Sequence, residues 1–420
     1  MSNPVQGALA RRLGTGDAVI VGLSAMIGAG IFAAFPPAAR AAGSWLLPAL
    51  GTAALVALCN AIASAQLAQS YPSSGGTYLF GREVLGPWWG YAAGWGFVVG
   101  KTASCAAMAM TFAAYAVPAG AWGRRLVAVV AVVVLTVLNL RGVTRTAYAA
   151  RILLGITGIV LAGLLVLLWS QSGAAPPGQL VAPAGGVFGV LQGAGLLFFA
   201  FAGYARIATL AEEVRRPQLL TRAVLIALGI TMALYLAIGT GLVRALGAAL
   251  PGTDTPLALA VEEVGAGWYA PVVRVGAAAA SLGALLALLA GVTRTGLAMA
   301  RERDLPTWLA SVDPRFQVPD HAQVLLGVVV SALVLVADLR GAIGFSSFGV
   351  LIYYAVANLA ALRQPIEQRR SPRLLQLIGL IGCLALVGTL PPASVLAGLA
   401  VFAVGIVGRL LLRSENGGGH

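Results

Sequence analysis

Two interrupted apolar stretches in the sequence could bind a small molecule through their backbone groups. The first is Ser24–Phe32, in the middle of an apolar segment that runs from about residue 18 to 42. It holds Gly28 and Gly30, and Pro36-Pro37 follows within two turns. Glycine loses the most conformational entropy in a helix and proline removes an amide donor, so this helix should be broken. Unwound backbone at membrane depth is tolerated where it lines a cavity or is buried, which predicts a binding site. A packing face of small residues is the alternative.

The second stretch is Phe198–Arg206, which contains Gly203 and lies five apolar segments after the first. Interrupted hydrophobic segments at corresponding positions of two halves indicate a transporter binding site. The amino termini of half-helices present bare N–H groups and a positive dipole end to an anionic group. The pairing of the two breaks therefore favours a binding site over simple packing.

The residue type that could move a proton is lysine, and Lys101 is the single lysine among 27 basic residues. It lies about 15 residues into the third apolar segment, which places it roughly 22 Å along a helix and near mid-membrane. An ionisable residue at that depth is a functional hypothesis by default, and lysine can release its proton where arginine cannot. We predict that Lys101 is a cation substitute and proton-linked switch. A structural hydrogen bond to the carbonyls of a broken helix, snorkelling and a misplaced span stay open as alternatives.

Composition identifies the elements that must position these residues as membrane helices. Of 420 residues, 59% are hydrophobic and 10% are charged, and the mean hydropathy is +0.90. These values are typical of a polytopic, all-α membrane protein. The net charge of +13 comes from basic residues spread between apolar segments, so no nucleic-acid partner is expected.

No pattern in the sequence indicates an enzyme, a cofactor or a metal site. Cys59, Cys105 and Cys383 all fall inside apolar segments and have no metal-ligand spacing. The sequence also lacks a nucleophile elbow, a phosphate-binding loop and paired carboxylates within the apolar segments.

Twelve apolar segments are long enough to be transmembrane spans. They are expected near residues 16–42, 46–70, 86–116, 125–140, 148–170, 187–209, 221–246, 270–299, 322–338, 343–362, 374–389 and 393–412. If the amino terminus is cytoplasmic, twenty arginines lie on the inside and six on the outside, in line with the positive-inside rule. Both termini of this multi-pass protein are therefore expected in the cytoplasm, with the chain in the cell membrane.

Four motifs occur in register with these spans. They are Ile27–Phe32, Tyr71–Tyr78 with Gly94-Trp95, Ala211–Pro217, and Arg294–Pro306. Together they resemble the amino acid–polyamine–organocation (APC) superfamily of amino acid permeases over nearly the whole chain. The resemblance implies one transmembrane transporter domain over 1–420 with a LeuT-like five-plus-five inverted repeat and broken helices one and six. Repeat one covers about 16–170, repeat two about 187–362, and two extra helices about 374–412.

The resemblance also implies a substrate site built from backbone groups of both breaks. These positions are Ser24, Ala25, Ile27, Gly28, Ala29, Gly30 and Ile31 in the first break and Phe199, Ala200, Ala202 and Gly203 in the second. The N–H groups from Gly28 to Ile31 would hold the substrate carboxylate, and carbonyls of both breaks would receive its α-amino group. Phe199 resembles the family's aromatic gate. Asp17, near the cytoplasmic end of the first span, is expected to belong to the inner gate.

The sequence departs from the family pattern at two places. Many members carry an acidic residue two positions after the span-six glycine, where this chain has Ala205 followed by Arg206. This argues against a cationic substrate; Arg206 either contacts an acidic substrate or pairs with Glu212-Glu213. A lysine of span five is the proposed sodium substitute in some members, and here that position is near Thr157, which carries no charge.

These observations predict secondary transport of a small or neutral L-amino acid by alternating access, driven by protons. Exchange, facilitated diffusion and a non-transporting amino acid sensor stay open. A sodium-coupled version would need oxygen ligands where span eight meets span one, and Ser281 is one candidate. The expected partners are the amino acid, protons and membrane lipid.

Overall fold

The computed structural model of the protein describes residues 14–71, 76–118, 120–142, 146–170, 180, 185–204 and 219–417. All regular structure within these ranges is helical. The first apolar segment forms α1 (Thr15–Met26), α2 (Ala29–Ala33) and α3 (Phe35–Ala42).

The remaining long helices follow the other expected spans closely. They are α4 (Leu46–Ser70), α6 (Pro87–Ala116), α7 (Ala121–Leu140), α8 (Thr146–Ser170), α9 (Gly186–Phe201), α11 (Leu219–Leu246), α13 (Ala270–Arg301), α14 (Asp320–Val336), α15 (Leu339–Arg363), α16 (Arg373–Thr389) and α17 (Pro392–Gly417). Two short α-helices connect them, α5 (Gly76–Leu85) and α12 (Pro256–Glu263). Short 3-10 turns cover Gly43–Trp45, Gly247–Gly252, Gly267–Tyr269, Thr307–Ala310 and Ile366–Gln368.

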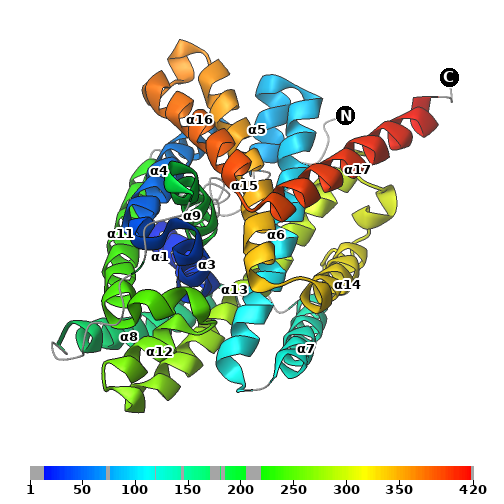
Figure 1. Ribbon diagram of the computed structural model, residues 1–420. Helices are drawn as coiled ribbons and strands as arrows, with labels where there is room; N and C mark the ends of the chain where they lie inside the picture. The colour runs from blue at the N-terminus through cyan, green and yellow to red at the C-terminus, as the bar shows by residue number, and fades with distance from the viewer. Residues whose placement is uncertain are drawn as a thin grey trace.

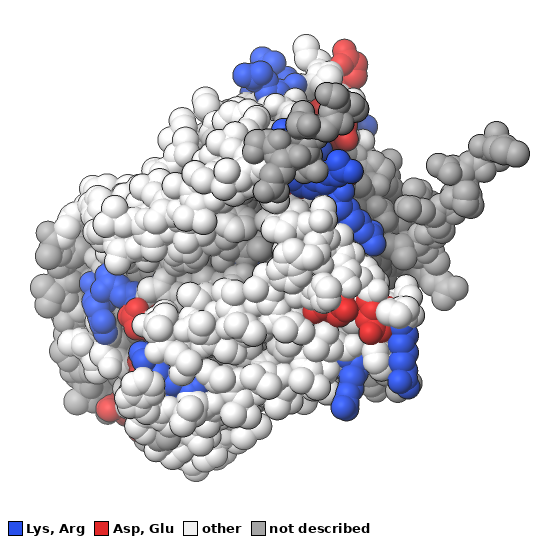
Figure 2. All heavy atoms as spheres, turned by 90° about the vertical axis from the view of Figure 1, so that its right-hand side faces the viewer, with Lys and Arg blue, Asp and Glu red and all other residues white. Residues whose placement is uncertain are grey.

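Nine helical segments in the described ranges are long and apolar enough to cross a membrane, and α9, α14 and α16 are shorter apolar helices. Large apolar side chains point outward from several of them; Val336, for example, is 78% exposed. Such a surface suits lipid rather than water. Figure 2 shows one face of this kind, on which charged side chains gather in a few patches and most of the surface is uncharged. The protein is thus an all-helical, polytopic membrane protein, whereas twelve crossings and the inverted repeat stay predictions.

Helix α6 forms the centre of the bundle, where it packs along α15 and α13 (Figure 1). Glycines allow its backbone to approach α15 closely. A β-carbon on Gly96 would lie 2.7 Å from the carbonyl oxygen of Gly349, and one on Gly100 would lie 2.9 Å from that of Ser346. This close packing fixes Lys101, the next residue of α6, inside the protein.

A second polar feature, at Asp304, ties the peripheral helix α17 to the bundle. Arg303 adopts a left-handed conformation (φ 57°) after α13 ends, and the chain turns so that the Asp304 carboxylate is fully buried. That carboxylate lies 2.8 Å from the Arg82 guanidinium, 2.7 Å from that of Arg409 and 3.6 Å from that of Arg413. The Tyr78 hydroxyl donates to it at 2.9 Å. We call these five residues the Asp304 cluster.

The Asp304 cluster joins α5, the end of α13 and α17, which extends away from the bundle in Figure 1. Burial, reinforced by the Asp304 charge, raises the pKa of the Tyr78 phenol, so Tyr78 remains a hydrogen-bond donor. Arg409 is one of the twenty arginines expected on the inner side from the sequence, whereas the structure buries its side chain completely.

Candidate substrate site at two helix breaks

The first break lies between α1 and α2, at Ile27 and Gly28. Ile27 (φ −83°, ψ 64°) and Gly28 (φ −120°, ψ −146°) have non-helical backbone angles. The Ile27 amide donates to the Leu23 carbonyl at 2.7 Å, and the Gly28 amide donates to the Met26 carbonyl at 2.9 Å. Helix α2 then begins at Ala29, so the first amides of a new helix lie directly after the break.

The second break follows α9. This helix ends at Phe201, and the chain then forms a turn over Ala202–Tyr204. The Ala202 amide donates to the Phe198 carbonyl at 3.1 Å. Ala205, Arg206 and the Ala211–Pro217 motif lie outside the described residues.

The two breaks are in direct backbone contact through two of the predicted glycines. A β-carbon on Gly30 would lie 2.5 Å from the Cα atom of Ala200. A β-carbon on Gly203 would collide with the carbonyl group of Ala25. The glycines therefore permit close packing of the breaks, which is the role that the sequence left open beside ligand binding.

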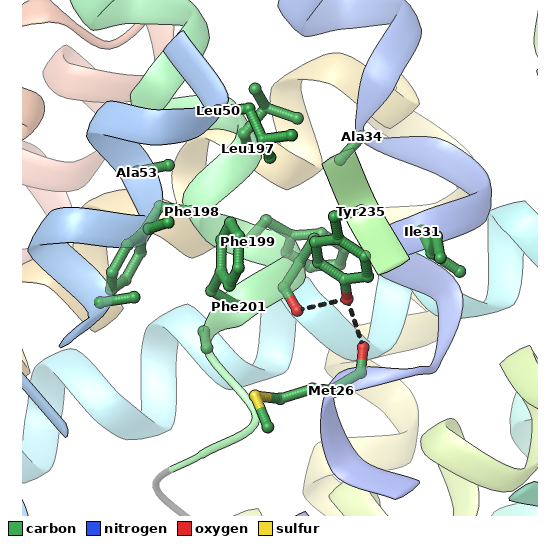
Figure 3. Close-up of a cluster of buried hydrophobic side chains, with 14 of the residues drawn as sticks. Met26, Ile31, Ala34, Leu50, Ala53, Leu197, Phe198, Phe199, Phe201 and Tyr235 are labelled. Carbon is green, nitrogen blue, oxygen red and sulfur yellow. Dashed lines mark hydrogen bonds between the residues drawn. The ribbon is translucent and has the colours of Figure 1, made fainter. Parts of the chain in front are cut away.

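Tyr235 of α11 bridges the two breaks. Its hydroxyl lies 2.7 Å from the Met26 carbonyl oxygen and 3.0 Å from that of Ala200, and its side chain is fully buried (Figure 3). A phenol has one proton to donate, so it serves one of the two carbonyls at a time. Sequence reasoning missed this residue because a tyrosine in an apolar helix is usually packing. The usable signal was its hydroxyl, which needs a partner when buried.

Lys101 reaches the second break from α6. The residue is 8% exposed, and its ammonium donates to the Ala202 carbonyl at 3.1 Å. Among the described residues, no carboxylate lies within ion-pair distance of this ammonium. One turn along α6, the Ser104 hydroxyl lies 2.6 Å from the Ser346 hydroxyl of α15. The carbonyl contact was one of the alternatives that the sequence left open for Lys101, and its role in coupling stays a prediction.

Two other predicted site residues, Phe199 and Ser24, belong to the helices that lead into the two breaks. Phe199 is buried in the apolar cluster between α9, α4 and α11 (Figure 3). The Ser24 hydroxyl donates within its own helix, to the Val21 carbonyl at 2.8 Å. The gate functions of Phe199 and Asp17 and the ligand contacts of the remaining backbone positions stay predictions.

Two further predicted positions lie on neighbouring helices. Thr157 is buried on α8, and Ser281 is buried on α13 one turn before Ala284, whose side chain packs against Gly28. The Ser281 hydroxyl has no hydrogen-bond partner within the described part of the chain.

Asp17 lies in the first turn of α1, where its carboxylate accepts a hydrogen bond from the Gly14 amide at 3.1 Å. A carboxylate at this place stabilises the helix amino terminus through its interaction with the helix dipole.

Comparison with known proteins agrees with this architecture. The amino acid permease family model matches residues 13–409. An uncharacterised transporter of Mycobacterium tuberculosis is 55% identical over 401 residues, which cover 95% of this chain and 90% of that protein. A branched-chain amino acid permease of Bacillus subtilis is 27% identical over 394 residues, covering 87% and 83% of the two chains. A chloroplastic cationic amino acid transporter of Arabidopsis thaliana is 26% identical over 430 residues, covering 93% and 74%.

The matched family and these relatives are transporters rather than enzymes, which confirms the resemblance drawn from the four sequence motifs. The chain belongs to the amino acid permease family of the APC superfamily.

Proposed function

We propose that this permease is a secondary active transporter of a small or neutral L-amino acid, coupled to protons through Lys101. The observation that carries the proposal is the meeting of the two helix breaks with the single lysine. An amino acid zwitterion needs N–H donors at one end and carbonyl acceptors at the other, and two broken helices supply both. The amides from Gly28 to Ile31 would hold the carboxylate, and carbonyls of the two breaks would hold the amino group.

The surroundings of the breaks support an uncharged substrate side chain. Lys101, Asp304 and Arg409 are the charged side chains buried within the described residues, and Asp304 is already paired with arginines. Within the described residues, a cationic side chain near the breaks would therefore have no free buried carboxylate as a partner.

The contact between the breaks supports transport by alternating access. The Gly30–Ala200 and Gly203–Ala25 contacts close the space between the two spans, so the substrate enters when these spans separate. Phe199 and Asp17 act as gates in this scheme. Both termini lie in the cytoplasm, as the distribution of arginines favours.

Uptake by liposomes tests the proposal. Purified protein is reconstituted, and uptake of labelled L-leucine and L-alanine is measured with and without an inward proton gradient. We expect the gradient to raise uptake by wild-type protein and to have no effect on Lys101→Gln. The control is Thr102→Ala, because the Thr102 hydroxyl donates to the Val98 carbonyl of its own helix at 2.7 Å.

Each alternative predicts its own result in this assay. Uptake that does not depend on the proton gradient and that occurs only with amino acid inside the liposomes indicates an exchanger. Binding without uptake under any condition indicates a sensor. Gradient-driven uptake that survives unchanged in Lys101→Gln would remove Lys101 from the coupling mechanism.

A further inference from the structure

The helix breaks expose backbone carbonyls, and two side chains of the protein already occupy them. The last carbonyls of a helix lack intrahelical partners, and this applies to the end of α9. Lys101 donates to the Ala202 carbonyl, and Tyr235 lies between the carbonyls of Met26 and Ala200. These groups belong to the set that the proposed function assigns to the substrate amino group.

Lys101 offers the same chemical group that the substrate would offer. Its side chain ends in an ammonium with a positive charge and three N–H donors, and so does the α-amino end of an amino acid at neutral pH. Two ammonium groups bound to one carbonyl would lie within a few ångströms of each other. Because like charges repel strongly in a poorly hydrated interior, both cannot occupy the Ala202 carbonyl together.

We propose that Lys101 occupies the substrate-amine position at Ala202 in the ligand-free protein and that the substrate amino group displaces it. This inference rests on the proposed function. Lys101 thus competes with the substrate. Without substrate, its ammonium satisfies the Ala202 carbonyl, and only a substrate with an amino group can displace it from that carbonyl. The amine requirement thus becomes the specificity rule of the second break.

Displacement also gives the lysine a second position. The Ser104–Ser346 hydroxyl pair lies one turn along the same face of α6 and can accept hydrogen bonds from the displaced ammonium. The two positions of Lys101, on the Ala202 carbonyl and beside Ser104, then correspond to the empty and the occupied site.

The single lysine makes this proposal measurable in the unmodified protein. Incorporation of lysine labelled with ¹³C and ¹⁵N gives one side-chain NMR signal, because Lys101 is the only lysine in the chain. We would titrate the protein with L-leucine, with its decarboxylated counterpart 3-methylbutylamine and with its deaminated counterpart 4-methylpentanoate. L-Leucine and 3-methylbutylamine are expected to shift the Lys101 signal in a saturable way, whereas 4-methylpentanoate leaves it unchanged.

The results separate this inference from the proposed function. Uptake of leucine with an unmoved Lys101 signal overturns displacement and leaves transport intact. No uptake, together with a signal that follows the amine, overturns transport and supports displacement. A signal that is insensitive to the amine at saturating concentration overturns displacement whatever the uptake.

Variants at position 101 provide a second readout. Lys101→Met removes the competitor, so L-leucine should bind roughly tenfold more tightly, because the site no longer has to be vacated first. Lys101→Arg keeps a permanent cation and should not gain affinity. Weaker binding by Lys101→Met would mean that the lysine supports the site rather than competing for it, which would overturn the proposal. Thermal unfolding checks the fold of each variant. If a variant is unfolded, the NMR titration of the wild-type protein alone tests the proposal.

Discussion

Two buried cations, Arg409 packed against α6 and Lys101 on α6 itself, have very different surroundings. Arg409 of α17 meets the Asp304 carboxylate at 2.7 Å and the Pro87 carbonyl at 3.0 Å. Its guanidinium also lies 4.3 Å and 4.6 Å from the ring centroids of Trp88 and Tyr91. Lys101 lies about 15 Å beyond Tyr91 along the helix. It has a hydrogen bond to one carbonyl and no carboxylate beside it in the described residues.

The difference separates a charge that holds helices together from one that can change position. A buried charge with a full set of partners is costly to disturb, because removing one partner leaves the other uncompensated. A buried lysine with a single neutral acceptor has only one hydrogen bond to exchange, and unlike arginine it can discharge by releasing a proton. The Asp304 cluster is therefore structural, and Lys101 suits a moving part.

The largest expected effect on stability comes from neutralising the centre of the Asp304 cluster. Asp304→Asn leaves Arg409 buried without a counter-charge, so we expect a loss of about 3–5 kcal/mol in the free energy of unfolding. Thermal unfolding in lipid nanodiscs measures it, with Lys101→Met as the matched comparison. If Asp304→Asn unfolds at the wild-type temperature, or if Lys101→Met is equally destabilised, then Arg409 and Lys101 do not differ in their structural role.

The next effect is steric and concerns the contact between the breaks. Gly203→Ala adds a methyl group that collides with the Ala25 carbonyl, and we expect a cost of about 1–3 kcal/mol together with a strong fall in uptake. Gly229→Ala on α11 is the control, because an added β-carbon there meets no atom within 4 Å. Labelled leucine uptake by liposomes is the readout. Equal uptake by the two variants would show that the breaks do not need this close approach.

A smaller effect is expected from the hydroxyl that bridges the breaks. Tyr235→Phe removes one hydrogen bond and should cost about 1 kcal/mol of stability. Tyr269→Phe removes a comparable bond, from the Tyr269 hydroxyl to the Val160 carbonyl at 3.1 Å, away from both breaks. Both variants should lose similar stability, while the affinity for substrate changes in Tyr235→Phe alone. An affinity change of the same size in both would assign Tyr235 a purely structural role.

The smallest effect on stability is expected at Arg413, the most exposed arginine of the Asp304 cluster. The Arg413 side chain is 45% exposed and lies 3.6 Å from the carboxylate, so Arg413→Ala should cost less than about 1 kcal/mol. Arg409→Met, at the fully buried position, should cost clearly more in the same unfolding assay. Similar losses in the two variants would mean that burial does not set the strength of these pairs.

Local sequence patterns were sufficient to predict the family, most of the long helices, the first break and the region where α9 ends. Apolar runs set helix location because each must be buried in lipid or protein, and the ends of α4, α13 and α15 fall within a few residues of the expected spans. Gly28 and Gly203 marked the breaks because glycine disfavours continuous helix wherever it lies. The place of Lys101 in the middle of α6 followed from counting residues along the apolar segment.

The partners of these residues depended on tertiary structure. Lys101 and Ala202 are 101 residues apart, Tyr235 and Met26 are 209 apart, and Arg409 and Asp304 are 105 apart. Hydropathy and periodicity report which face of a helix is apolar, but not which helix packs against it. Only the packed bundle therefore determined that Arg409 is buried against a carboxylate, that Tyr235 joins the breaks, and that Lys101 holds a carbonyl of the second one.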